Sequence, residues 1–164
     1  MKKVLILLAI CVLAVYGTAA ATLSASGANH FINELEALSL AGKADEYCAR
    51  LHVNATVSIR DRTAPDFPRD IDGGKKELCD YVTFAMKGVD LLGIRSEATR
   101  ADFTVNRSWL HPWIADVSYS EKRTTQMSKS HVTLNTASED HWTLVQTFNG
   151  VKVMRLSSVA RVVE

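Results

Sequence analysis

Six side chains could form a binding or acid–base site, and two of them lie on one stretch of alternating sequence. Between Ser130 and Phe148, Trp142 and Leu144 share a face with the carboxylate of Asp140. Because alternate residues of a strand point to the same side, Asp140 is expected to face the interior with these apolar residues. General acid–base catalysis uses such an inward carboxylate, together with a nearby hydroxyl donor.

A second alternating stretch supplies the donor and another carboxylate. From Trp113 to Thr125, Tyr119 and Glu121 share a face with Val117. Tyr81 adds a phenol on the apolar stripe expected of a helix near the middle of the chain. The candidate ligand-binding residues are Tyr81, Tyr119, Glu121, Asp140 and Asp61, with Trp142 as an aromatic wall.

Other kinds of site lack their residue patterns. The five histidines are scattered without the spacing of a metal-binding pair. No nucleophile elbow of the form GxSxG and no glycine-rich phosphate loop occurs. We therefore expect neither a metal site nor a cofactor.

The first residues, MKKVLILLAICVLAVYGTAAATL, have the organisation of a signal peptide. Lys2 and Lys3 precede an apolar run from Val4 to Tyr16, and small residues follow it. This run is shorter than the roughly 20 apolar residues that a membrane span requires. We expect residues 1–20 to be cleaved and the protein to be periplasmic or secreted, without a membrane span after processing. The alternatives are an N-terminal helix of the core and, third, a retained single anchor.

The remaining residues, 21–164, are expected to form one domain with its own core. Without Lys2 and Lys3 the chain has 17 basic and 18 acidic residues, a net charge of −1. The basic residues form no run longer than two, so we expect no nucleic-acid partner.

Two cysteines remain after the leader, Cys48 and Cys79. In an oxidising compartment an even pair favours a disulfide. The alternative is two separate buried thiols, because spacing alone does not show that the two Cα atoms are close enough.

The order of elements predicts an α+β fold. A helix around residues 31–40 precedes a short helix at 45–51, a strand at 53–60, a loop at 61–74 and a helix at 75–89. Four strands follow, at residues 95–107, 113–125, 130–148 and 151–163, the last two joined by the hairpin signal Asn149-Gly150. Helices early and strands late indicate helices covering one face of an antiparallel sheet.

Three segments resemble nuclear-transport-factor-2-like domains, the SnoaL-like and ketosteroid-isomerase-like group. They are FINELEALSLAGKADEYCARLHVNATVSI, GGKKELCDYVTFAMKGV and EDHWTLVQTFNGVKVMRLSSVARVV. The resemblance covers nearly the whole chain after the leader. It implies a cone-shaped curved antiparallel sheet, with N-terminal helices closing a pocket. The group contains isomerases, dehydratases and cyclases as well as binding modules, so the fold alone does not assign the function.

The hypothesis is therefore an exported module, without catalytic activity, that binds a small apolar molecule or a protein partner. The alternative is a cofactor-independent isomerase or dehydratase, which Asp140 or Asp61 buried beside a tyrosine would favour. Relatives often dimerise through the outer face of the sheet. Here that face would carry Thr133, Thr143 and Val145, and we expect a homodimer.

Overall fold

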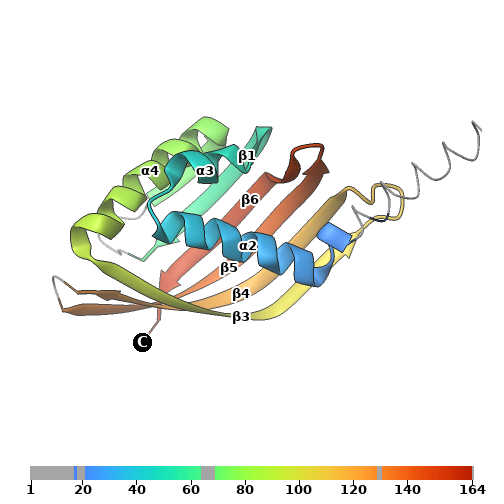
Figure 1. Cartoon of the computed structure of the whole chain (residues 1–164). Helices are drawn as coiled ribbons and strands as arrows, with labels where there is room; N and C mark the ends of the chain where they lie inside the picture. The colour runs from blue at the N-terminus through green and yellow to red at the C-terminus, as the bar shows by residue number, and fades with distance from the viewer. Residues whose placement is uncertain (1–16, 18–20, 64–68, 129–130, 164) are drawn as a thin grey trace, which may run out of the picture.

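The computed structural model describes residue 17 and residues 21–63, 69–128 and 131–163 (Figure 1). The expected signal peptide lies outside these residues, except for Gly17. None of the described helices is long and apolar enough to cross a membrane. The elements are α2 (Ala25–Leu40), α3 (Ala44–Ala49), β1 (Leu51–Arg62), β2 (Arg69–Gly74), α4 (Lys75–Leu92), β3 (Ile94–Arg107), β4 (Ile114–Met127), β5 (Val132–Thr147) and β6 (Gly150–Val162).

The six strands form one curved sheet in the order β2-β1-β6-β5-β4-β3. Figure 1 shows α2, α3 and α4 on the same side of this sheet, which curves around them. The expected α+β cone is thus confirmed. The sheet is mixed rather than wholly antiparallel, because β1 and β6 run parallel. A long connection through α4 and four other strands separates these two strands, as parallel neighbours require.

The expected loop at residues 61–74 is partly wrong. β1 continues to Arg62, and β2 pairs with it in antiparallel register. Arg60 Nη2 lies 2.9 Å from Asp72 Oδ2, and Arg62 pairs with Asp70. Opposite charges on neighbouring strands stabilise the pairing, a long-range effect that the Pro- and Gly-rich local sequence conceals.

Helix α2 begins after Ser24, whose Oγ accepts a hydrogen bond from the backbone N–H of Gly27 at 3.1 Å. This cap satisfies one of the free amides at the helix start. The helix then buries Phe31, Ile32 and Leu35 against the sheet. Residues three and four apart share one face of a helix, so this spacing fixes which side of α2 covers the cone.

Helix α4 is held at both ends. The Glu77 carboxylate accepts from the Gly74 backbone N–H at 2.8 Å, and Gly93 closes the helix in the left-handed conformation at φ 60°. Between these ends Leu78 and Val82 are buried in the core. The helix thereby forms a second wall of the cone, facing α2.

A disulfide joins Cys48 in α3 to Cys79 in α4, with the Cα atoms 5.7 Å apart. The expected pairing is confirmed. The bond links the six-residue helix α3 to the longer α4, and the neighbouring Tyr47 is buried in the core.

The outer face of the sheet is polar. Thr133 is exposed, and the Thr143 hydroxyl donates to Asp116 Oδ1 across the two strands at 2.7 Å. Val145 is half-buried on the same side of β5. The homodimer through this face stays a prediction.

Candidate functional site

The concave side of the cone holds a partly open cavity of about 540 Å³. Its walls come from α2, α4 and the concave face of the sheet. This volume lies within the range of small-molecule pockets, roughly 300–1,000 Å³. All six candidate ligand-binding side chains line it: Asp61, Tyr81, Tyr119, Glu121, Asp140 and Trp142. The structure therefore brings the candidates together, although their roles in binding stay predictions.

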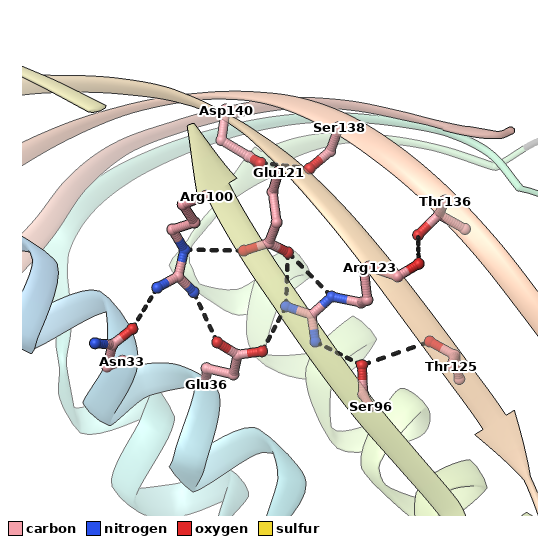
Figure 2. Close-up of polar contacts among 10 residues, drawn as sticks. All are labelled: Asn33, Glu36, Ser96, Arg100, Glu121, Arg123, Thr125, Thr136, Ser138 and Asp140. Atoms are coloured by element: carbon pink, nitrogen blue, oxygen red, sulfur yellow. Dashed lines mark hydrogen bonds and ion pairs between the residues drawn. The ribbon is translucent and has the colours of Figure 1, made fainter. Parts of the chain in front are cut away.

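Asp140 lies deep in this cavity and is only 8% exposed. Within the described chain its hydrogen-bond donor is the Ser138 hydroxyl, 2.6 Å from Oδ2. Figure 2 shows the pair on β5. A carboxylate accepts several hydrogen bonds, so Asp140 keeps acceptor capacity for a ligand.

Tyr119 stands directly opposite Asp140, on β4, and is 6% exposed. Burial raises the pKa of the Tyr119 phenol, and the negative charges of Asp140 and Glu121 raise it further. Its hydroxyl therefore stays protonated at neutral pH. A protonated phenol beside a carboxylate is the combination that acid–base chemistry uses.

Tyr47 is a site residue that the sequence analysis missed. It comes from α3, is 8% exposed and lines the same cavity. Burial, then Tyr81 and Asp140, raise the pKa of Tyr47 to about 12. No described side chain or backbone group is hydrogen-bonded to its hydroxyl, although buried polar groups are normally paired. The one feature of the sequence that could have indicated Tyr47 as a cavity residue is its position beside Cys48.

Asp61 and Tyr81 lie at another part of the wall. Asp61, at the end of β1, accepts hydrogen bonds from the Thr63 amide at 2.9 Å and the Thr63 hydroxyl at 2.6 Å. Burial raises the pKa of Tyr81, and the charge of Asp61 adds to this effect. Asp61 thus makes the hydrogen bonds to a nearby backbone amide that aspartates commonly make in turns, and it also lines the cavity.

Glu121 is buried, but both of its oxygens are occupied (Figure 2). Arg100 Nε lies 2.9 Å from Oε2, and Arg123 Nη2 lies 2.7 Å from Oε1. Glu36, from α2, bridges the same two guanidiniums at 2.7 and 2.6 Å. The four side chains form a closed set of two positive and two negative charges that fastens α2 to the sheet. We conclude that Glu121 organises the wall more than it receives a ligand.

The pKa of Arg123 shows how strong this pairing is. Burial alone would lower it, yet the charges of Glu121 and Glu36 raise it above its usual value. Arg123 therefore remains charged in the wall of the cavity. Its Nη1 also donates to the Ser96 hydroxyl at 2.9 Å.

The inward position of Arg100 contradicts simple alternation along its strand. Strict alternation along β3 would put Arg100 on the face opposite to the apolar residues Ala101, Phe103 and Val105. The register with β4 shifts between Ala101 and Thr104, and Asp102 has a φ of 55°. This bulge changes which face each residue takes, so Arg100 and Phe103 both turn inward while Ala101 is exposed.

Trp142 forms an aromatic wall beside Asp140. Its indole nitrogen is buried and makes no hydrogen bond of acceptable geometry with any described residue. It nevertheless lies close enough to the Tyr119 hydroxyl to lower the pKa of that phenol slightly against the effect of burial. Within the described ranges, no three His, Cys, Asp or Glu side chains are placed to hold a metal ion.

Comparisons with known proteins give structural matches only. No family model matches the sequence, and neither does any curated protein. A candidate scytalone dehydratase from Novosphingobium aromaticivorans is similar in structure, with a TM-score of 0.62 at 12% identity, over 90% of this chain and 89% of that one. The β subunit of a benzoate 1,2-dioxygenase from Burkholderia mallei gives a TM-score of 0.59 at 11% identity, over 82% and 89% of the two chains.

A third similar structure is an NTF2-like protein with a cystatin-like fold, also from Novosphingobium aromaticivorans. Its TM-score is 0.54 at 15% identity, and the match covers 78% of each chain. At these identities the likeness concerns the backbone arrangement, which agrees with the curved sheet and covering helices described above. The chain therefore has the nuclear-transport-factor-2-like fold.

Proposed function

We propose that the cone binds one small molecule with an apolar body and a hydrogen-bonding group directed at Asp140. The observation that carries this proposal is the cavity of about 540 Å³ in which Tyr47 and Asp140 keep unused hydrogen-bonding capacity. A ligand that enters the cavity could pair with both groups.

A small molecule suits this site better than a protein partner does. The polar groups lie inside the cone, where the flat surface of a protein does not reach. Two of the similar structures are named as a dehydratase and as a dioxygenase subunit, which supports a small-molecule role for the fold. The disulfide supports the further proposal that the protein works outside the cytoplasm.

The binding proposal is tested with 2-naphthalenemethanol, an apolar ring system bearing one hydroxyl. Isothermal titration calorimetry should show binding to the protein. Ser158 lines the cavity, whereas its neighbour Ser157 on β6 points to the other face. Ser158→Leu should therefore fill part of the cavity and abolish binding, and Ser157→Leu should not. Equal binding by both variants would place the probe outside the cone and refute the proposal.

A second candidate is acid–base catalysis on the bound molecule, because Asp140 is buried beside Tyr119. The Asp140 carboxylate would take a proton from a carbon next to a carbonyl. The Tyr119 hydroxyl would donate a hydrogen bond to the oxygen that gains negative charge. The return of the proton from Asp140 to a different atom of the same molecule would complete an isomerisation.

This candidate is tested by hydrogen–deuterium exchange at the methyl group of 2-acetylnaphthalene in D₂O, followed by proton NMR. The enzyme should accelerate exchange, and Asp140→Asn should lose most of that acceleration. Glu139→Gln removes a carboxylate from the exposed side of the same strand and should keep it. If the bound ketone exchanges no faster than the free ketone, the protein binds the molecule without catalysing proton exchange on it.

A further inference from the structure

We propose that the ligand of the cone is an organic cation, an arylalkyl- or alkylammonium compound whose charged group pairs with Asp140. This inference rests on the small-molecule function proposed above and adds the chemical class of the ligand. Its basis is the charge balance of the cavity wall and the position of Asp140, a buried carboxylate whose described hydrogen-bond donor is a neutral hydroxyl.

The described residues that line the cavity carry a net negative charge. It contains six ionisable acids and bases other than tyrosine: Glu36, Asp61, Arg100, Glu121, Arg123 and Asp140. In their ordinary charge states at pH 7 these four carboxylates and two guanidiniums give a net charge of −2. A cation is therefore favoured in this cavity over an anion.

Neither guanidinium of the wall is free to receive an anionic ligand. Arg100 donates to Glu121 and Glu36, and its remaining amino group donates to Asn33. Arg123 donates to Glu121 and Ser96 and pairs with Glu36 (Figure 2). The negative charge that remains after this pairing belongs to Asp61 and Asp140.

Asp140 is the better partner for a ligand cation. Asp61 is half-buried and already bonded by the amide and the hydroxyl of Thr63. Asp140 is more than nine-tenths buried, and its described donor is one neutral hydroxyl, that of Ser138. A carboxylate on the cavity wall with no cation among its described partners attracts an ammonium group more than a neutral or anionic one.

Aromatic rings complete a receptor for a cation. Three aromatic side chains line the cavity together with Asp140: Tyr47, Tyr119 and Trp142. Burial is the main cause of the raised pKa of both tyrosines, and the negative charge of Asp140 contributes to it. Aromatic faces attract ammonium groups, with Trp the strongest. The Tyr119 ring already packs against the Arg100 guanidinium, 5.4 Å from its centre, and stacks with Phe103 at 5.6 Å. We therefore assign the aromatic contact with the ligand cation to Trp142 and Tyr47.

The unpartnered hydroxyl of Tyr47 is a second, independent indication of a ligand. This side chain is more than nine-tenths buried, lines the cavity and finds no hydrogen-bond partner in the described chain. A phenol oxygen can accept a hydrogen bond from an ammonium N–H. An ammonium has three donors, which Asp140 and Tyr47 could share.

The experiment compares three probes with the same naphthalene body: 2-naphthylmethylammonium, 2-naphthalenemethanol and 2-naphthoate. Calorimetry at pH 7 should show the ammonium binding at least tenfold more tightly than the alcohol, and the carboxylate binding most weakly. Asp140→Asn should reduce the ratio of ammonium to alcohol affinity to about twofold or less. Glu139→Gln removes the same charge from the exposed side of β5 and should leave the ratio unchanged.

The outcomes separate the two proposals. If the alcohol or the carboxylate binds as tightly as the ammonium, the cation inference fails and the small-molecule function stands. If the ammonium preference survives in Asp140→Asn, the pairing with Asp140 is wrong. If none of the three probes binds, the small-molecule function fails as well.

Discussion

Tyr119 and Asp140 face each other across β4 and β5, and both side chains line the cavity of the cone. Each is more than nine-tenths buried, and the next inward positions include the core residues Val117 beside Tyr119 and Trp142 beside Asp140. A continuous apolar face would have stabilised the sheet more. The polar pair therefore points to a ligand rather than to stability alone.

Tyr47 should make the protein sensitive to alkali. Its pKa rises from 10.0 unfolded to about 12 in the fold, so the folded state holds the phenol proton more tightly. This contribution to stability is fully present below pH 10 and is lost as the pH rises toward 12. Between pH 8 and pH 11 the free energy of unfolding should fall by about 1.4 kcal/mol more in the natural protein than in Tyr47→Phe. Urea unfolding at both pH values measures this, and a constant difference between the proteins would contradict it.

The disulfide should contribute substantially to stability. Cys48 and Cys79 are 31 residues apart, and closing such a loop stabilises a fold by about 3–4 kcal/mol in the chain-entropy description. The double variant Cys48→Ala/Cys79→Ala should lose this amount in urea unfolding. Dithiothreitol should destabilise the natural protein equally and leave the double variant unaffected. A reductant effect of the same size in both would mean that the bond has no such role.

Neutralising Glu121 should destabilise the fold, because Glu121 belongs to the ion-pair cluster with Glu36, Arg100 and Arg123. Glu121→Gln would leave Arg100 and Arg123 to share the Glu36 carboxylate, and breaking a buried ion pair from one side costs about 3 kcal/mol. The exposed Glu97 on β3 offers a matched control, and Glu97→Gln should change stability by less than about 0.5 kcal/mol. Chemical unfolding compares the two. Similar losses would show that the cluster contributes nothing specific.

Export should leave a defined amino terminus. Expressed with its leader in a bacterial host, the protein should accumulate outside the cytoplasm with an intact mass that corresponds to residues 21–164 or begins one residue later. Mass spectrometry of periplasmic and medium fractions checks this. Full-length chain retained in the membrane fraction would favour an uncleaved anchor.

Regular alternation made part of the site predictable. On β5 the alternation is unbroken from Asp140 to Trp142. The prediction that both side chains face the interior, made from their apolar neighbours on the strand, is therefore correct. The same reasoning failed at Arg100, because a bulge depends on pairing with β4 and leaves no local signal. It also missed β2, whose pairing depends on distant arginines of β1.

Tyr47 shows another limit of local patterns. A six-residue helix is too short for a reliable periodicity, and α3 is linked to α4 by a disulfide between residues 31 positions apart. The polar cluster of Glu36, Arg100, Glu121 and Arg123 likewise joins three elements far apart in the sequence. Contacts of this kind form only because the fold brings distant elements together. The order of the elements predicted the α+β fold but not these contacts.

A crystal structure of the protein soaked with 2-naphthylmethylammonium tests the binding of a cation to Asp140 most directly. We expect electron density for the ring inside the cone, with the ammonium nitrogen within hydrogen-bonding distance of an Asp140 oxygen, at roughly 2.7–3.2 Å. Density for the probe only on the outer face of the sheet, or no density in the cone, would refute this binding mode.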